Sequence, residues 1–159
     1  ATYAPSCFNN QPWRFLVVNR RRELEIVKEN LAGSNYWGKA APVIVLVFTR
    51  PELDCRLSDG RDYSFFSTGL AVENLMLQAT REGLIAHPVA GYKPVPLKEA
   101  FGVDPEMTLL TLVIIGYPGD EAQLSEKHRE QEHSPRDRKP EGEVIMVNRW
   151  KEQGAPEGA

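Results

Sequence analysis

The stretch SFFSTGLAVENLMLQATREGL, from Ser64 to Leu84, is the strongest helix candidate in the chain. Asp62 or Ser64 is suited to cap its start, and Gly83 stands where a left-handed residue would end it. Apolar residues occupy nearly every side of the predicted helix, namely Leu70, Leu75, Met76, Leu77 and Ala79. A helix with this pattern is expected to be central in the fold or to lie at an interface.

The segments on either side of this helix predict a sheet. Two apolar runs, Val43 to Phe48 and Leu109 to Ile115, lack polar alternation, which is typical of strands buried on both faces. Two more strands are expected at Trp13 to Val18 and Ile85 to Ala90, and helices at Glu23 to Leu31 and Pro96 to Phe101. The alternation of strands and helices predicts an α/β or α+β layered domain with a mixed sheet. Residues 1–159 are expected to form one domain.

The composition is that of an ordinary globular protein. The chain has 159 residues, of which 42% are hydrophobic and 26% charged, and its net charge is -3. That balance argues against nucleic acid as the main partner. The longest apolar run is too short to span a bilayer, and no secretory signal opens the sequence. We therefore expect a soluble, cytoplasmic protein that does not bind membranes.

Most familiar catalytic and metal-binding motifs are missing from the sequence. The three histidines, His87, His128 and His133, have no ligand spacing, so no metal site is expected. The two cysteines, Cys7 and Cys55, form no CxxC pair and no disulfide framework, and are expected to be ordinary thiols. No GxSxG, GxGxxG or Walker sequence occurs. The chain therefore offers no nucleophile, Rossmann or P-loop chemistry.

The C-terminal third of the chain changes character. Thirteen of the 24 residues from Asp120 to Glu143 are Asp, Glu, Lys or Arg, which predicts a solvated segment outside the core. Apolar residues return from Glu143 to Trp150, where the preceding charged segment offers little to pack on. We expect this tail to dock against another surface, such as a second subunit.

Two features could bind a ligand. The loop PSCFNNQPW, from Pro5 to Trp13, places amide donors and acceptors densely between prolines, which suits a flat heterocycle but also ordinary turns. Arg136 and Arg138 stand beside Lys139 in SPRDRKP, where two guanidiniums could clamp a phosphate or merely form a solvated charge run. On the local sequence alone, both alternatives stay open for each feature.

Taken in order, the motifs resemble the nitroreductase family of FMN-dependent NAD(P)H oxidoreductases. The matching segments are PSxxNxQPWRF (Pro5 to Phe15), GLAVENLMLQATREGL (Gly69 to Leu84), HPVAGY (His87 to Tyr92), LVIIGYP (Leu112 to Pro118) and RKPxxxVI (Arg138 to Ile145). The resemblance implies an α+β homodimer with a mixed central sheet flanked by helices and FMN at the subunit interface. It also implies that the central helix lies at that interface and that the C-terminal segment reaches the partner.

The resemblance assigns cofactor-binding roles by position. In the first loop, Ser6, Cys7, Asn9 and Gln11 match residues that line the flavin ring and ribityl chain. In HPVAGY, Pro88 matches a position that packs near the ring. Val89, Ala90 and Gly91 match the turn whose backbone N–H points at flavin N5. Arg136 and Arg138 match the phosphate-binding positions. The flavin then performs the redox step, with NAD(P)H as electron donor and a small oxidised substrate such as a nitroaromatic or quinone as acceptor. No catalytic side chain is expected.

Two departures from the family pattern leave alternatives open. The arginine-rich segment with which the family opens is missing before Ala1, so we expect the sequence to lack its native N-terminus. The stretch from Phe48 to Tyr63 is too short for the helices that cover the substrate pocket in many members. Dehalogenation, heterocycle oxidation, flavin cleavage or a non-catalytic flavin-binding dimer are therefore the alternatives to reduction of a nitroaromatic.

Overall fold

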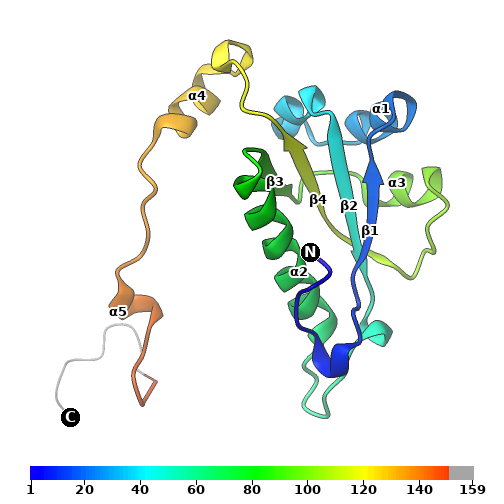
Figure 1. Cartoon of the computed structure of the whole chain (residues 1–159), viewed down its shortest axis with the longest axis vertical. Helices are drawn as coiled ribbons and strands as arrows, with labels where there is room; N and C mark the ends of the chain where they lie inside the picture. Colours follow the sequence, from blue (N-terminus) through cyan, green and yellow to red (C-terminus); the bar gives the residue numbers. More distant parts are fainter. Residues whose placement is uncertain (151–159) are drawn as a thin grey trace. The chain divides into compact units, whose positions relative to one another are not determined.

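The computed structural model describes residues 1–150, and its contacts divide the chain into two compact units. Residues Ala1 to Asp120 form the first unit, and a smaller one begins at Glu121. The sheet and the helices α1, α2 and α3 that pack on it all belong to the first unit (Figure 1).

The sheet has four strands in the order β1-β2-β4-β3. Their bounds are Arg14–Val18 for β1, Val43–Thr49 for β2, Ile85–Val89 for β3 and Thr108–Gly116 for β4. Every neighbouring pair is antiparallel, and one register line crosses the sheet from Leu16 through Leu46 and Leu112 to Val89. The edges of the sheet are therefore β1 and β3.

The prediction of a mixed sheet is wrong for the described residues. The helical crossover between β2 and β3 makes these two strands run in the same direction, as alternating strands and helices suggest. The last strand, β4, inserts between them and pairs antiparallel with both. The order of the strands is a long-range property, so the alternation of local elements could not reveal it.

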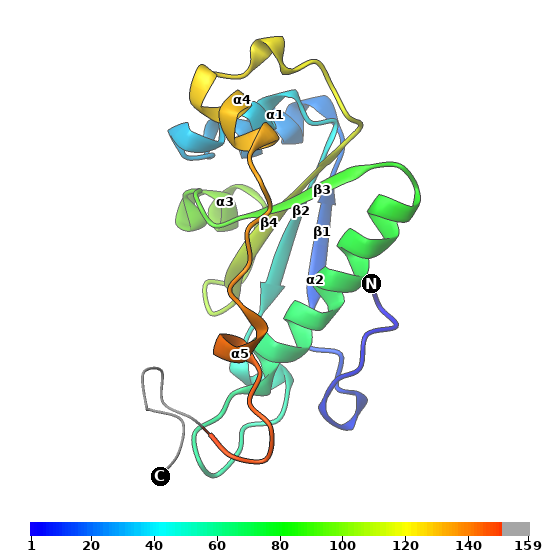
Figure 2. The same ribbon diagram turned by 90° about the vertical axis from the view of Figure 1, so that its left-hand side faces the viewer.

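Helices cover both faces of the sheet (Figures 1 and 2). One face carries α1 (Arg21–Glu29), α3 (Pro94–Ala100) and the 3-10 segment η2 (Gly33–Ala40), and the other carries α2 (Tyr63–Arg81). The start of α2 is capped as expected, since an Asp62 carboxylate oxygen accepts a hydrogen bond from the Ser64 N–H at 3.0 Å. Its end is followed by Gly83 at φ +75°, a left-handed conformation that favours glycine.

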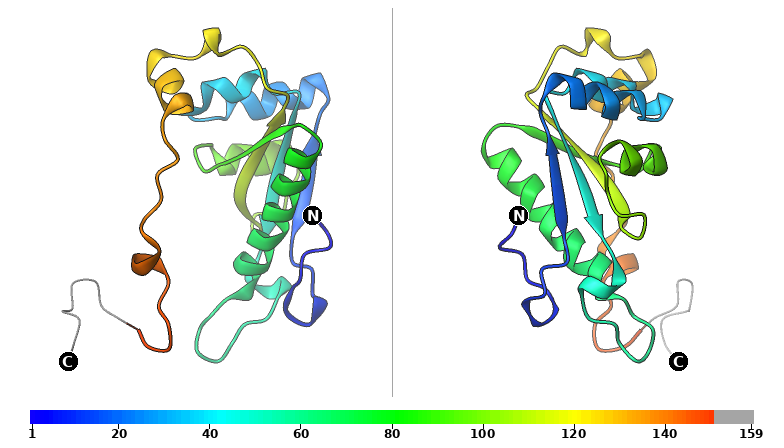
Figure 3. Two further views of the ribbon diagram at one scale, coloured as in Figure 1. Left: turned by 60° about the vertical axis from the view of Figure 1, so that its left-hand side comes forward. Right: turned by 90° about the vertical axis from the view of Figure 1, so that its right-hand side faces the viewer.

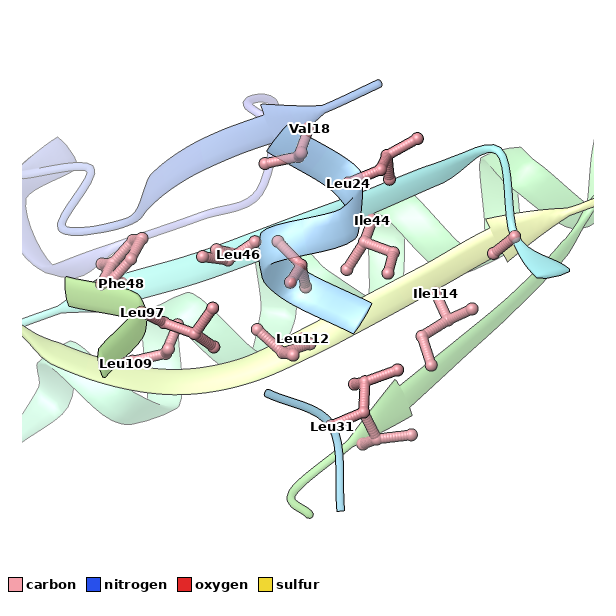
Figure 4. Packing of buried hydrophobic residues seen from close by; sticks show 13 residues of the cluster. Val18, Leu24, Leu31, Ile44, Leu46, Phe48, Leu97, Leu109, Leu112 and Ile114 are labelled. Atoms are coloured by element: carbon pink, nitrogen blue, oxygen red, sulfur yellow. The ribbon is translucent and has the colours of Figure 1, made fainter. Parts of the chain in front are cut away.

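The two faces of the sheet are packed differently, and the alternation along β2 shows this. Ile44, Leu46 and Phe48 point into a cluster built with α1 and α3 (Figure 4). Val45 and Val47 point to the opposite face and pack with Val72 of α2. Figure 3 shows α2 lying along this face of the sheet. All of these β2 side chains are buried, which confirms the prediction of a strand covered on both faces.

The second unit contains no buried residue between Glu121 and Trp150. Its described elements are the 3-10 turn η4 (Glu121–Gln123) and the helices α4 (Glu126–His133) and α5 (Glu141–Val144). The Ser125 hydroxyl caps α4, and His133 Nε2 lies 2.6 Å from a carboxylate oxygen of Glu121. Taken by itself, this unit is the solvated segment that its charge predicts. Across residues 1–150, no helix combines the length and apolarity needed to cross a membrane.

Candidate functional site

The loop before β1 has an unusual backbone. Phe8, Asn9 and Gln11 adopt φ values of 47°, 59° and 52°, although none is glycine. Left-handed backbone costs about 1–2 kcal/mol for an ordinary L residue, and less for asparagine. Hydrogen bonds inside the loop offset this cost, because the Gln11 N–H donates to Ser6 Oγ at 3.0 Å and Gln11 Nε2 donates to the Asn9 carbonyl at 3.2 Å. Four of the predicted cofactor residues thus form one ordered turn.

Both ends of this loop are anchored to the body of the first unit. Ala4 and Trp13 are buried together against Ala71 of α2. Thr49, at the end of β2, donates from Oγ1 to the Pro12 carbonyl at 3.2 Å. The loop is therefore held beside α2, while Asn9 and Gln11 remain exposed at its tip.

The cysteines are not ordinary thiols, so that prediction is wrong. Cys7 and Cys55 form a disulfide with Cα atoms 5.9 Å apart, although 48 residues separate them in the sequence. The topology explains the pairing, because antiparallel β1 and β2 place Arg14 opposite Phe48. The segment before β1 and the segment after β2 consequently meet at the same end of the sheet.

Asp54 and Asn10 complete this cluster around the disulfide. Asn10 Nδ2 donates to Asp54 Oδ1 at 3.3 Å and lies 3.7 Å from Cys55 Sγ. Asp54 is buried, and its second carboxylate oxygen has no hydrogen-bond partner among the described residues. Donor atoms of Cys7, Asp54 and Cys55 lie within 4.8 Å of one another. Because both sulfurs share the disulfide, they offer no thiolate to a metal in this state.

The second part of the predicted flavin site is the turn that follows β3. The Gly91 carbonyl accepts hydrogen bonds from the Ala32 N–H at 2.8 Å and from Asn35 Nδ2 at 2.9 Å. A Cβ at Gly91 would lie 2.8 Å from Asn35 Nδ2 and 3.1 Å from the Ala32 Cβ, so this position needs glycine for close packing. The contacts fix the turn to η2.

Tyr92 secures the other side of the turn. Its hydroxyl donates to the Leu109 carbonyl at 2.7 Å, and burial raises the pKa of the phenol above its ordinary value. The hydroxyl is therefore protonated throughout the physiological pH range and remains a hydrogen-bond donor.

Ala90 directly follows β3, and the alternation of backbone groups along that strand predicts an outward N–H at this position. Pro88 has no N–H, and in edge strand β3 it must occupy a position that faces away from β4. Because strand positions alternate, the Ala86 N–H faces the same open edge, and the alternation continued one residue past Val89 predicts that direction for the Ala90 N–H. No turn or loop hydrogen bond of the described residues uses the Ala90 N–H. Val89, by contrast, is buried in the core, so only its backbone could reach a ligand.

The predicted phosphate clamp lies in the second unit. Arg136 and Arg138 are exposed, and neither forms a salt bridge within residues 1–150. Arg138 Nη1 donates to the neighbouring Asp137 carbonyl at 2.8 Å, which leaves most of its guanidinium donors available. Both guanidiniums therefore keep hydrogen-bond donors that no described carboxylate occupies.

The first unit does not bring the two predicted flavin-binding segments, the loop before β1 and the turn after β3, together. The loop with Ser6, Cys7, Asn9 and Gln11 precedes edge strand β1, whereas the turn from Pro88 to Gly91 follows edge strand β3. Three strand spacings, about 14 Å, separate these edges. Among the described residues, no hydrogen bond or ring contact joins the loop to the turn.

Comparison with known proteins identifies the family. The sequence profile of the Nitroreductase family matches residues 27–117, which is more than half of the chain. The chain belongs to the nitroreductase family. This membership confirms the resemblance found in the sequence motifs, two of which, GLAVENLMLQATREGL and HPVAGY, lie wholly inside the matched region.

Individual relatives of this nitroreductase-family chain agree with the assignment. An uncharacterized 15.4 kDa protein from the ask 5′ region of Mycolicibacterium smegmatis is 32% identical over 120 residues, covering 76% of this chain and 79% of the relative. An Archaeoglobus fulgidus protein with the provisional name NADH dehydrogenase/NAD(P)H nitroreductase is 29% identical over 131 residues, or 79% and 72% of the two chains. A solved structure described as an oxidoreductase containing FMN is 27% identical, covers 94% and 77%, and has a TM-score of 0.82.

Three residues around the candidate site of this nitroreductase-family protein were not predicted from its sequence. Cys55, Asp54 and Asn10 together tie the first loop to the segment before α2. The only sequence signal for them is the even number of cysteines, which is too weak to predict the Cys7–Cys55 pairing without knowledge of the strand order. The sequence also could not single out Ala90 from its neighbours, because that distinction depends on β3 lying at the edge of the sheet.

Proposed function

We propose that this chain is an FMN-dependent oxidoreductase that transfers hydride or electrons from NAD(P)H to a small oxidised substrate, such as a nitroaromatic or quinone. Family membership and the FMN-containing relative support the proposal. The observation that carries it is the register of edge strand β3, which turns the Pro88 position away from β4 and so predicts an outward backbone N–H at Ala90. A donor of this kind can hydrogen bond to flavin N5 without competing with the sheet.

The described residues fit the chemical parts of FMN. The isoalloxazine needs hydrogen-bonding groups along its polar edge, and the exposed amides of Asn9 and Gln11 can supply them. The phosphate needs fixed positive charge, which Arg136 and Arg138 offer without an internal partner carboxylate. When bound, FMN supplies the redox chemistry, accepting hydride from the nicotinamide and passing electrons to the acceptor. The protein contributes position and electrostatics, so no acid or base side chain is required.

The proposal includes a homodimer with FMN at the interface. The loop and the turn lie at opposite edges of one sheet, so the loop of one copy and the turn of another are better placed to enclose a flat ring. On α2, Phe66 and Leu77 are each 59% exposed. They are eleven residues apart, about three helical turns, and therefore lie on the same side of the helix. An apolar stripe of this kind favours burial against a second copy.

The acceptor and the compartment also remain parts of the proposal. The segment between β2 and α2 contains only the 3-10 turn η3 (Pro51–Leu53) and an isolated bridge from Arg56 to Asp62. No helix from this segment covers a substrate pocket, so the identity of the acceptor stays a prediction. A cytoplasmic location is proposed as well, although disulfides are uncommon in that compartment. The Cys7–Cys55 bond would then have to be reversible.

The role of the Ala90 N–H can be tested with a matched pair of proline variants. Ala90→Pro removes the proposed donor, and Ala86→Pro removes an N–H that faces the same open edge four residues earlier. We expect Ala90→Pro to slow flavin reduction by NAD(P)H about tenfold or more, as loss of a hydrogen bond to a reacting centre does. Ala86→Pro should reduce at the wild-type rate.

Thermal unfolding of both proline variants provides the control for folding. Comparable unfolding temperatures with equal reduction rates would contradict the role of Ala90. A protein that takes up no FMN, as judged by its visible spectrum after gel filtration, would refute the proposed function itself.

A further inference from the structure

We propose that the Cys7–Cys55 disulfide is a reversible thiol switch that sets the affinity of the Ser6–Gln11 loop for flavin. The proposal rests on the proposed FMN function and names a means of regulating the same site. It starts from the position of the bond, which joins the loop that carries Ser6, Asn9 and Gln11 to the segment that leads into α2.

The disulfide is the main constraint on the middle of the loop. The ends are held by Ala4 and Trp13, which are buried against α2. In residues 6–10, the contacts with other segments are the Cys7–Cys55 bond and the hydrogen bonds of Asn10 to Asp54 and to Cys55. Nearer β1, the Gln11 carbonyl accepts from Arg14 Nη1 and the Pro12 carbonyl from Thr49 Oγ1. The 3.7 Å contact between Asn10 and Cys55 depends on the position of the sulfur. Breaking the bond would therefore weaken the second tether together with the first.

The loop backbone needs such a constraint. Three of the four residues from Phe8 to Gln11 have positive φ and are not glycine. Conformations of this kind persist only where the surrounding structure holds them. Once the covalent tether is lost, we expect these residues to relax towards ordinary φ values. The exposed amides of Asn9 and Gln11 would then no longer be ordered in advance for the flavin edge, and binding would have to order them.

Both sulfurs are within reach of a reductant. Cys7 and Cys55 are only partly buried, and the adjacent Phe8 is 93% exposed. A small dithiol can attack one sulfur as its thiolate and form a mixed disulfide, which its second thiol resolves. The Cys7–Cys55 bond breaks and the bond of the oxidised dithiol forms. Two electrons and two protons end on the two cysteines.

The switch gives a direction to regulation. Under oxidising conditions the loop is tied down and retains FMN, whereas under reducing conditions the loop loosens and FMN dissociates more readily. Reversibility also reconciles the bond with a cytoplasmic location, where stable structural disulfides are rare. Asp54 lies beside both sulfurs, so a chelator must be present in the reduced state to prevent a metal ion from replacing the bond.

The test compares the full chain in its oxidised form with the form reduced by dithiothreitol, after the reductant has been removed without oxygen and with a chelator present. The Cys55→Ser variant breaks the bond while leaving the predicted flavin residues in place. We expect reduction and Cys55→Ser each to raise the FMN dissociation constant about tenfold, a loss typical of having to order a loop on binding. Deuterium uptake by residues 5–12 should rise in both.

A matched control separates this effect from a general loss of stability. Val27→Ala creates a cavity under α1, in the cluster on the other face of the sheet, and should lower the unfolding temperature without changing FMN affinity. Titration of thiols should find none in the oxidised chain and two after reduction.

Each contrary outcome has a distinct meaning. Equal FMN affinity in the oxidised, reduced and Cys55→Ser forms would overturn the switch while leaving the proposed function intact. Two titratable thiols after exposure to an oxidant would also overturn it, because the bond would then not form. Failure of every form to bind FMN would refute the proposed function and with it the effect on flavin. Deuterium uptake would still show separately whether the bond orders the loop.

Discussion

The two faces of the sheet differ in how completely their helices cover them. On the α1 and α3 face, leucine, isoleucine and phenylalanine side chains fill a closed core. On the α2 face, the helix buries mostly small residues, namely Ser64, Ser67, Thr68, Ala71, Val72 and Ala79. Large apolar side chains remain outside, since Phe66 and Leu77 are each 59% exposed and Val17 of β1 is 57% exposed. The α1 and α3 face is covered within the chain, whereas the α2 face leaves apolar side chains exposed that the proposed dimer would bury.

The largest expected effect is a difference in the free energy of unfolding between substitutions on the two faces of the sheet. Leu46 and Val45 are neighbours in β2 that point to the α1 face and the α2 face respectively. Leu46→Ala should lower the free energy of unfolding by about 3 kcal/mol, because the closed core cannot collapse around the lost methyl groups. Val45→Ala should cost about 2 kcal/mol or less. Urea denaturation measures both, and a larger loss for Val45→Ala would reverse the proposed contrast.

A second substitution tests the outer side of α2 directly. Leu77→Arg places a charge in the apolar stripe and should raise the dimer dissociation constant about 100-fold, close to 3 kcal/mol. Val95→Arg on α3 is the matched control, because Val95 is 57% exposed and lies on the other face. Sedimentation equilibrium gives the masses. If Leu77→Arg remained dimeric like Val95→Arg, or the wild-type chain were a monomer, the α2 face would not be the interface.

The proposed phosphate clamp belongs to the second unit, and its loss should have a smaller effect. Arg138→Ala should weaken FMN binding about tenfold, because a charge-assisted hydrogen bond contributes roughly 1.5–3 kcal/mol. Arg129→Ala removes an exposed arginine from α4 in the same unit and should leave the affinity unchanged. Isothermal titration with FMN compares the two variants. Equal affinities would show that the phosphate binds elsewhere.

The smallest expected effect concerns a buried hydroxyl on the α2 face. Thr68 is fully buried, and its Oγ1 has no hydrogen-bond partner among the described residues. Thr68→Val replaces the hydroxyl by a methyl group of similar shape, so it should be neutral or raise the free energy of unfolding by up to about 1 kcal/mol. A loss of stability in thermal unfolding would mean that the hydroxyl has a partner in the assembled protein.

Local sequence patterns predicted most elements of the fold. The continuous apolar runs identified β2 and β4, and the Asp62 cap and Gly83 bounded α2 within a few residues. The antiparallel order escaped prediction, because the insertion of β4 between β2 and β3 depends on contacts between distant segments. The family resemblance supplied a hypothesis that local physics could not, namely that a polar loop, a turn and an arginine pair serve the same cofactor.

The details of the candidate site depended on the strand order. The disulfide could not be predicted without the pairing of β1 and β2, since 48 residues separate its cysteines in the sequence. Gly91 matched a flavin position in the sequence, and the structure shows that it is also needed for packing against Asn35. The outward N–H at Ala90 is predicted from the structure, because Pro88 fixes which positions of β3 face the open edge and Ala90 follows two residues later.

Anaerobic reduction of the FMN-loaded chain tests the central claim most directly. The full chain is saturated with FMN, freed of excess cofactor and mixed with NADH or NADPH in the absence of oxygen while its visible spectrum is recorded. The proposed function predicts that at least one nicotinamide bleaches the flavin band stoichiometrically and that a quinone restores it. Retained FMN whose band neither NADH nor NADPH changes would contradict the claim that this chain is an NAD(P)H oxidoreductase.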